Sequence, residues 1–308
     1  MASTRRRFLM HAAAMGGAAA LAHPTKAFSA TGPHATGTAT DTFSPPELLT
    51  RQAARARAAA PSLTQSGDDD YAEMYRARRN WGRWGQNDQV GAINLITAEK
   101  RAAAAGLVRN GRTVSLSRVF EPPQHFMTKS SLGSGGGYVM DYLGFIYHGN
   151  TVTHVDALCH IWDEDGMWQG RDPDVEITTQ GAHFADITQW NTGIVTKGIL
   201  LDVPRHRGVA HVTRDRPVQG TELEDIAQAQ GVTVEPGDAL LVHSGWQSAT
   251  DAGESAGAGL HPSCAEFIRD HDVALLGWDL MDGRNASRLP WPVHGVLFNF
   301  GVALLDNA

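Results

Sequence analysis

Cysteine is scarce in this chain, which has only Cys159 and Cys264 among its 308 residues. A closed zinc site built from several thiolates is therefore not expected. At most one disulfide can form, and only if the protein reaches an oxidising compartment. Two interpretations stay open: a bridge between the two cysteines, or two separate buried thiols.

An excess of positive charge is also lacking. The chain has 26 Lys and Arg against 33 Asp and Glu, a net charge of -7, and its basic residues form no stripe. Proteins that bind nucleic acid usually gather basic residues on one face. We therefore expect no nucleic-acid partner.

No apolar run looks able to cross a bilayer. The run HAAAMGGAAALA (residues 11–22) is short and rich in Gly and Ala, whereas a transmembrane helix needs about 20 apolar residues. It follows the basic stretch TRRRFLM and ends in Ala-Leu-Ala, which is the order of an export signal. The paired arginines before Phe-Leu resemble the twin-arginine (Tat) signal. We expect residues 1–30 to be a Tat-type export signal, the mature protein to be periplasmic or secreted, and no stable membrane anchor.

The rest of the chain divides into a linker and one domain. Residues 31–70 are rich in Ala, Thr, Ser, Gly and Pro and lack hydrophobic periodicity, which is typical of a flexible linker. Residues 71–308 carry interleaved helical and β-branched segments, which predict a single α/β domain with a mixed β-sheet flanked by helices. The expected helices are 69–80, 97–107, 221–230 and 262–271, and the expected strands are 113–119, 198–203, 239–243 and 273–278. Thr97 is the expected N-cap of the second helix, and Thr221 to Glu224 have capping-box spacing.

The stretch YHGNTVTHVDALCHIW (residues 147–162) concentrates side chains that bind metals. In a helix these side chains would point in different directions, whereas alternate residues of a strand share a face. A strand would place on one face His148, Asn150, His154, Asp156 and His160. We therefore expect residues 153–160 to be extended.

A straight strand cannot bring all of these side chains to one ion, because each residue advances the chain by about 3.3 Å. His154 and Asp156, about 7 Å apart, form the core pair. His148 and His160 can approach them if the chain bends, for which Gly149 offers one place. Imidazole together with carboxylate suits Zn²⁺, Mn²⁺ or Fe²⁺. We predict a divalent metal site, Zn²⁺ or Mn²⁺, with His148, His154 and Asp156 as ligands.

The same stretch resembles the signature His-x-Gly-Thr-His-x-Asp-x-Pro-x-His of the cyclase family of metal-dependent hydrolases, which includes bacterial kynurenine formamidase and isatin hydrolase. Four signature positions match: Thr153, His154, Asp156 and His160. Three differ: Asn150 stands at the first histidine, Val152 at the glycine and Leu158 at the proline. A neutral amide is a poor substitute for imidazole on Zn²⁺ but can serve Mn²⁺. We favour His148 as the replacement ligand, and Asn150 stays open.

The resemblance extends to the end of the chain and implies a swivelling β/α/β-like fold. The similar segments are residues 80–97 (NWGRWGQNDQVGAINLIT), 197–208, 240–246 and 259–279. Relatives are often dimers or tetramers, so a homo-oligomer is expected. They also continue beyond GVALLDNA, which suggests a truncated C-terminus.

The family also suggests catalytic residues. His160 is the expected proton shuttle, although the matching histidine binds a second metal in dinuclear members; a mononuclear site is favoured here because Asn150 replaces a histidine. Ser263 stands where many members carry a glutamate, and His261 nearby is a predicted catalytic residue, either a replacement ligand or a general base; a capping or loop histidine is the alternative. Asp279 and Asp282 can each orient an imidazole or simply be solvated. His294 matches a family histidine without an argued role.

Tryptophans from two segments, Trp81, Trp84, Trp162 and Trp168, can line an aromatic substrate pocket or pack in the core. The resemblance implies hydrolysis of an amide, formamide or cyclic amide carbonyl by water that a metal activates. The expected partner is a small molecule, an aromatic amide or lactam. The alternatives are a lactonase or secondary-metabolite cyclase with the same metal site, and a non-catalytic exported protein that binds a metal or ligand.

Overall fold

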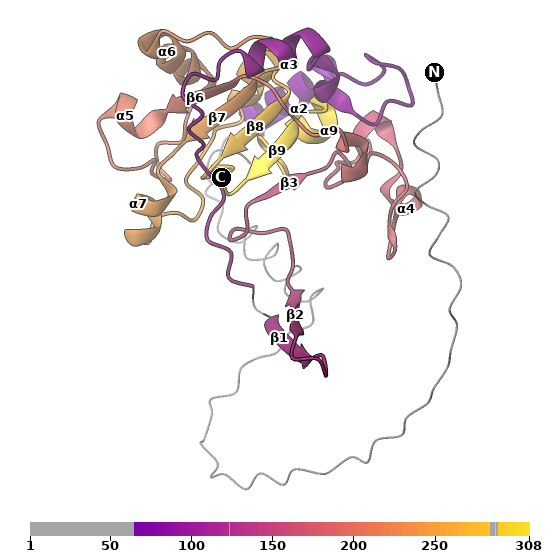
Figure 1. Cartoon of the computed structure of the whole chain (residues 1–308). Coiled ribbons are helices and arrows are strands. Elements are labelled where there is room, and N and C mark those ends of the chain that lie inside the picture. The colour runs from indigo at the N-terminus through magenta and orange to yellow at the C-terminus, as the bar shows by residue number, and fades with distance from the viewer. Residues whose placement is uncertain (1–64, 123, 284–286, 288) are drawn as a thin grey trace, which may run out of the picture. The chain divides into compact units, whose positions relative to one another are not determined.

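The computed structural model describes residues 65–122, 124–283, 287 and 289–308. The expected export signal and most of the expected linker lie outside these residues. The central sheet of the described part has five strands in the order β3, β9, β8, β7, β6 (Figure 1). Their bounds are β3 His154–Asp156, β6 Gly198–Asp202, β7 Ala239–His243, β8 Leu275–Trp278 and β9 Ala303–Asp306. Strands β6 to β9 are parallel and β3 is antiparallel to β9, so the expected mixed sheet is confirmed.

Helices connect the parallel strands, because parallel neighbours need a crossover. Helix α6 (Gly220–Gln230) follows β6, α8 (Cys264–Asp270) follows β7, and α9 (Val296–Phe300) follows β8. Helix α6 buries Leu223, Ile226 and Ala227, and every residue of β8 is buried. These elements share one hydrophobic core, which confirms the expected α/β domain.

The remaining elements are shorter or lie before the sheet. They are the helices α2 Gln65–Arg78, α3 Ala98–Ala105, α4 Pro173–Glu176, α5 Val203–Arg207 and α7 Trp246–Asp251, the 3-10 turns η1 Gly91–Leu95, η2 Trp168–Gly170 and η3 Ile187–Trp190, and the strands β4 Ile177–Thr178 and β5 Gly181–Ala182. Thr97 caps α3 as expected, since its hydroxyl accepts a hydrogen bond from the Lys100 amide at 3.2 Å. The structure contains no helix among the described residues that is long and apolar enough to cross a membrane.

Two local expectations are wrong. The capping box at Thr221 does not form, because α6 begins one residue earlier at Gly220. The Gly220 amide donates instead to the hydroxyl of Ser263, 43 residues further on, at 2.9 Å. Residues 113–119 form no strand and are mostly exposed; β-branched residues favour a strand only where a neighbouring strand offers a pairing edge.

A hairpin absent from the sequence interpretation follows this irregular segment. Strands β1 (Gln124–Ser131) and β2 (Gly137–Gly144) pair only with each other, as an antiparallel two-stranded sheet. The glycine-rich run between them makes the turn, with the Leu132 amide donating to the Gly136 carbonyl at 2.7 Å. Almost every residue of both strands is exposed.

Candidate metal centre

Strand β3 carries two buried polar side chains on one face. His154 and Asp156 are 5% and 0% exposed, and they share a face because side chains alternate along a strand. The carbonyl of Val152 lies 2.7 Å from Nδ1 of His154, which leaves Nε2 of the same ring 3.4 Å from Oδ1 of Asp156. The predicted core pair is therefore brought together as the alternation requires.

The extended segment ends sooner than expected. Strand β3 stops at Asp156, and the next residues turn, with the His160 amide donating to the Ala157 carbonyl at 2.9 Å. The expectation that residues 153–160 are extended is thus wrong beyond Asp156. The turn nonetheless brings Nε2 of His160 to 3.8 Å from Oδ1 of Asp156. We expected curvature of the strand to bring His160 toward Asp156, and a turn after the strand does so instead.

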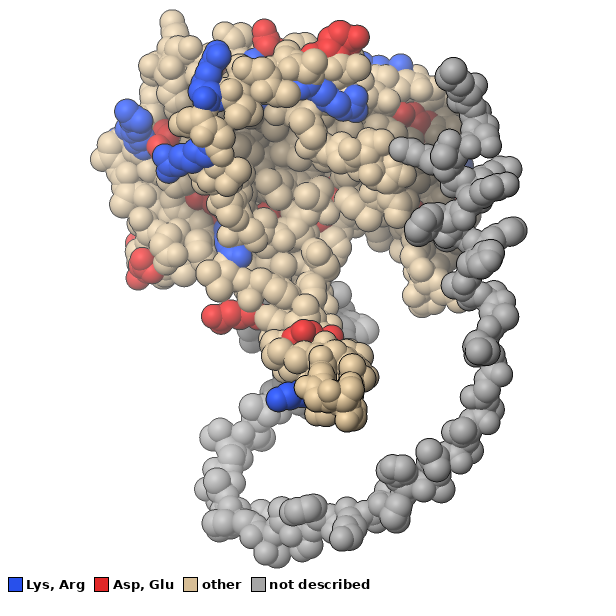
Figure 2. Space-filling model, viewed as in Figure 1, with Lys and Arg blue, Asp and Glu red and all other residues tan. Residues whose placement is uncertain are grey.

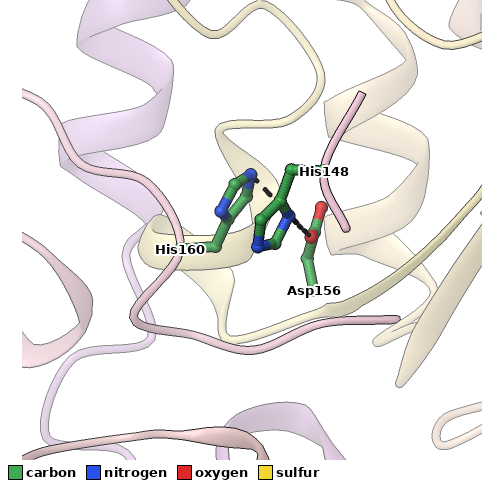
Figure 3. Close-up of side chains that lie close together, drawn as sticks. All are labelled: His148, Asp156 and His160. Atoms are coloured by element: carbon green, nitrogen blue, oxygen red, sulfur yellow. Dashed lines mark ion pairs between the residues drawn. The ribbon is translucent and has the colours of Figure 1, made fainter. Parts of the chain in front are cut away.

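His148 reaches the same carboxylate from the other side. The backbone bends at Gly149, whose φ of 134° lies in the region that favours glycine. Nδ1 of His148 then lies 2.9 Å from Oδ1 of Asp156. Figure 3 shows the His148 and His160 rings side by side, with the Asp156 carboxylate next to the His148 ring. The two rings stack with centroids 3.9 Å apart. Asn150, the alternative ligand, is exposed, and its backbone carbonyl accepts a hydrogen bond from Arg118.

Two sets of ligand atoms share Asp156. The atoms within each set lie within 4.8 Å of one another: His148, Asp156 and His160 form one set, and His154, Asp156 and Asp306 form the other. Asp306 is the site residue that the sequence interpretation missed. It lies on β9 directly opposite His154 in the β3–β9 pair. The sequence near β3 does not indicate which strand will pair with it, so Asp306 could not be predicted as a neighbour of His154.

The buried carboxylate of Asp156 is approached by imidazole nitrogens but accepts no well-aligned hydrogen bond from the described residues. Neither of its oxygens accepts a hydrogen bond of acceptable geometry from any described residue, although buried polar atoms are almost always satisfied. If Nδ1 of neutral His154 donates to the Val152 carbonyl, Nε2 directs a lone pair at this carboxylate. Two electron-rich atoms that face each other need a cation between them, either a proton or a metal ion. The residues present therefore fit a divalent ion with nitrogen and oxygen ligands.

The charges of the site agree with this arrangement. Burial alone would raise the pKa of Asp156, but the His148 and His154 imidazoles outweigh it and lower that pKa well below its usual range. Burial lowers the pKa of His160 to about 4, despite the nearby Asp156. For His154 burial acts in the same direction, but Asp156 and the Val152 carbonyl dominate and raise its pKa.

A second buried imidazole lies against Asp306. His294 contacts the Asp282 carboxylate through Nδ1, and its Nε2 lies 3.3 Å from Oδ2 of Asp306. The indole nitrogen of Trp278 donates to the other oxygen of Asp306 at 2.5 Å. Burial disfavours the charged ring, but the two carboxylates outweigh it and raise the pKa of His294 well above its ordinary value. Asp282 thus orients an imidazole, one of the two roles considered for it.

Arg118 forms hydrogen bonds to three chain segments around the site. Its guanidinium donates to the carbonyls of Asn150 and Asp279 at 3.0 and 2.6 Å and to Oδ1 of Asn307 at 3.1 Å. The amide of Asn307 donates in turn to the carbonyls of Gly149 and Val152. These contacts hold the loop between His148 and His154. Burial lowers the pKa of Arg118 to about 10, although the negative charges of Asp279 and Asp306 act to raise it.

Other candidate residues lie in different surroundings. Nδ1 of His261 lies 2.9 Å from the Ser263 hydroxyl, and its ring packs edge-on against Tyr71, so the structure does not place it in either ligand set. Asp279 accepts hydrogen bonds from the backbone amides of Ser244, Gly245 and Trp246. Both cysteines are free thiols.

Three of the four tryptophans lie in or against the core, and the fourth is exposed. Trp168 is fully buried, and Trp81 and Trp84 pack against the core, so core packing accounts for these three. Trp162 is 42% exposed. Its carbonyl accepts a hydrogen bond from the indole of Trp291, whose ring lies 6.0 Å from that of His294.

Comparisons with known proteins agree with this architecture. Residues 108–283 match the family model named Cyclase, described as "Putative cyclase". Because the match spans more than half of the chain, the protein belongs to the cyclase family. A crystal structure of a novel cyclase is 26% identical, with 76% of this chain and 85% of that chain covered and a TM-score of 0.65.

Two isatin hydrolases are more distant. One, bound to the product analogue thioisatinate, is 14% identical, with 61% of this chain and 70% of that chain covered. Isatin hydrolase A from Ralstonia solanacearum is 18% identical, with coverages of 67% and 82%. Both have a TM-score of 0.40, a similarity too low to carry an argument about activity. No curated protein sequence matches the chain.

Proposed function

We propose that this protein is a metal-dependent hydrolase that cleaves an amide, formamide or cyclic amide carbonyl of a small molecule. The observation that carries the proposal is the convergence of imidazole nitrogens on the buried Asp156 carboxylate: Nε2 of His154 and Nδ1 of His148 lie 3.4 and 2.9 Å from its Oδ1. Neither Asp156 oxygen accepts a hydrogen bond of acceptable geometry from the described residues. Membership of the cyclase family supports an enzymatic role.

The buried set His154, Asp156 and Asp306 would hold a divalent ion, Zn²⁺ or Mn²⁺, with His148 completing the set from the more exposed side. Such an ion supplies an electrophile for the carbonyl and makes water more acidic. The protein residues orient its ligands: the Val152 carbonyl holds the His154 ring, and Trp278 holds Asp306.

His160 would move protons in this reaction. Its pKa of about 4 keeps the ring neutral near pH 7, so it can accept a proton from water and return it to the leaving nitrogen. Its side chain is 25% exposed, which leaves access for a substrate. Trp162, which is 42% exposed, and Trp291, whose ring lies 6.0 Å from that of His294, would contact an aromatic substrate.

Export through a twin-arginine-type signal and assembly into a homo-oligomer belong to the same proposal. Export is supported by the order of residues 1–22, with TRRR before an apolar run. It is tested by fractionating cells that produce the full chain and a variant with Arg5 and Arg6 replaced by lysine. The variant should remain in the cytoplasm.

Turnover measurements test the chemistry. The purified protein is stripped with chelator and assayed on N-formylkynurenine, isatin and simple lactones, with and without Zn²⁺ or Mn²⁺. We expect hydrolysis of an aromatic amide or cyclic amide only when metal is present, and loss of metal and turnover in His154→Ala. Preference for lactones would point to the lactonase alternative, and stoichiometric metal without any turnover would support a binding protein.

A further inference from the structure

A row of three aromatic rings leads to the candidate metal centre. The Phe120 and Phe145 rings lie 4.7 Å apart, and the Phe145 and Tyr147 rings lie 5.0 Å apart. Tyr147 in turn packs edge-on against the ring of His154, with the two centroids 6.2 Å apart. Phe120, Phe145 and Tyr147 are here called the aromatic row. Because the row ends on a candidate metal ligand, a molecule bound along it would reach the centre.

The aromatic row is not part of the hydrophobic core that the described residues form. Phe120 and Tyr147 are 39% and 55% exposed, and Ile146 beside them is exposed as well. Single exposed apolar side chains are common, whereas contiguous ones usually mark a binding site. Residues 145–153 contain no Lys, Arg, Asp or Glu, and in the view of Figure 2 most of the surface of the β1–β2 hairpin and of the segments that lead to it is uncharged. This surface therefore suits an apolar ligand.

The row lies next to the accessible ligand of the centre. His148 follows Tyr147 in the chain, and its ring packs edge-on against the same His154 ring, with centroids 5.1 Å apart. The His148 side chain is 49% exposed, whereas those of His154 and Asp156 are 1% and 0% exposed. A small molecule that approaches the centre from the side of His148 would therefore pass Tyr147.

Other aromatic side chains border the centre from different segments. Trp162, two residues after His160, is 42% exposed, and the ring of Trp291 lies 6.0 Å from that of His294. The centre thus has two apolar surfaces beside it, the aromatic row and these tryptophans. Small-molecule sites usually combine such apolar walls with a few polar groups that act on the ligand.

We propose that the aromatic row binds an apolar group of the substrate, so that the substrate carries an apolar group on each side of the amide bond that is cleaved. This inference rests on the proposed hydrolase function and narrows it. Hydrolysis adds water across the C–N bond and releases a carboxylic acid and an amine. A formamide has only hydrogen on its carbonyl carbon, and a compact cyclic amide has one ring system, so each would leave one surface empty. An anilide with an apolar acyl group would occupy both surfaces.

A series of anilides with the metal-loaded wild type tests the substrate class. Acetanilide, butyranilide and hexananilide share the same aromatic amine and differ only in the length of the acyl chain. We expect kcat/KM to rise by about two- to fourfold for each methylene that contacts the aromatic row, because contact removes the methylene from water. The gain should appear mainly as a lower KM, as expected for contacts made equally in the ground state and the transition state. A series without any gain would overturn the proposal.

Alanine variants of the row locate the effect. Phe145→Ala removes the middle ring, and Phe120→Ala removes a ring that comes from a different segment than the one that carries His148. In both variants the ratio of kcat/KM for hexananilide to that for acetanilide should fall by about fivefold or more. The matched control is Phe126→Ala, because Phe126 is 57% exposed and stacks on Tyr142 of the hairpin; it should keep the wild-type ratio.

The ratio separates binding of the acyl group from a structural role. A ring that only supports the fold would lower kcat/KM for both anilides equally and leave their ratio unchanged. An unchanged ratio in both row variants, or an equal fall in the control, would overturn the proposal.

Titration calorimetry of the chelator-stripped protein measures binding without turnover. Hexananilide should bind at least about 10-fold more tightly than acetanilide, and Phe145→Ala should remove most of that difference. Such binding without turnover by the metal-loaded protein would support the aromatic row and contradict the hydrolase function. Equal binding of the two anilides would overturn the aromatic row, even if formanilide or isatin is hydrolysed and the hydrolase function stands.

Discussion

His154 and Asp306 face each other across the antiparallel pair of β3 and β9. The pair joins two segments that lie about half the chain apart, and it places a second carboxylate beside the imidazole and carboxylate of β3. Asp306 in turn contacts His294 and Trp278. One strand pairing thus connects the candidate ligands to a buried, charged network.

Replacing Asp306 should weaken metal binding. Asp306→Asn keeps the size of the side chain and its bond from Trp278 but removes a negative charge from the buried ligand set. We expect the affinity for Zn²⁺ or Mn²⁺ to fall by at least about 100-fold, given that even outer partners of metal ligands are worth about 10–100-fold. Titration calorimetry measures it, with the exposed Glu266→Gln as the charge-matched control. An unchanged affinity would remove Asp306 from the ligand set.

Metal binding should release a proton near pH 6.5. Asp156 and the Val152 carbonyl raise the pKa of His154 above its ordinary value of about 6.5. More than half of the metal-free rings therefore carry a proton at that pH, and they must lose it to bind an ion. Calorimetry in buffers of different ionisation enthalpy measures the release directly. The number of protons released should decrease as the pH rises above the pKa of His154, and release that does not vary with pH would contradict this assignment.

His160 should matter for turnover more than for metal content. His160→Ala removes the neutral ring that is proposed to move protons, and general acid–base groups contribute about 10²–10⁴-fold. We expect kcat to fall by about 100-fold while the purified variant keeps its full metal content. Metal analysis alongside the assay decides the point, since a variant that loses an ion would make His160 a ligand.

The stability of the metal-free protein should depend on pH through His294. Asp282 and Asp306 raise the pKa of His294 in the folded state, so its contribution is fully present below the unfolded pKa of about 6.5. That contribution is lost as the pH rises through the folded-state pKa. Urea unfolding of wild type and His294→Gln from pH 6 to 9 should show their difference shrinking as the pH rises. If the difference in unfolding free energy between the two proteins stayed constant across this pH range, His294 would not be the source of the pH dependence.

Arg118 should be important for stability beyond its charge. Its guanidinium donates to three oxygens on three segments, those of Asn150, Asp279 and Asn307. Arg118→Met would leave these acceptors without their donor and should lower the free energy of unfolding by about 3 kcal/mol. Arg118→Lys restores the charge but not the planar fork, so it should recover only part of the loss. Chemical denaturation compares all three proteins.

The sequence predicted the main helices and the central strands well. In β7, in α6 and in the strand that ends at Trp278, hydrophobic patterns and β-branched residues are local signals, and tertiary packing reinforces them. The strand expected at 113–119 failed because a strand depends on a neighbour that the local sequence does not specify. The hairpin of β1 and β2 was missed for a different reason: both strands are exposed, so burial imposed no hydrophobic alternation on their sequences.

By itself the sequence determined that His154 and Asp156 share a face, because alternation is a property of the backbone over two residues. It also indicated the bend at Gly149, since glycine tolerates a positive φ. Only the tertiary structure decided that His148 rather than Asn150 approaches Asp156, that a turn carries His160 back, and that Asp306 joins them. These contacts depend on which strands pair and where the chain turns, and those choices are made by the packing of the whole domain.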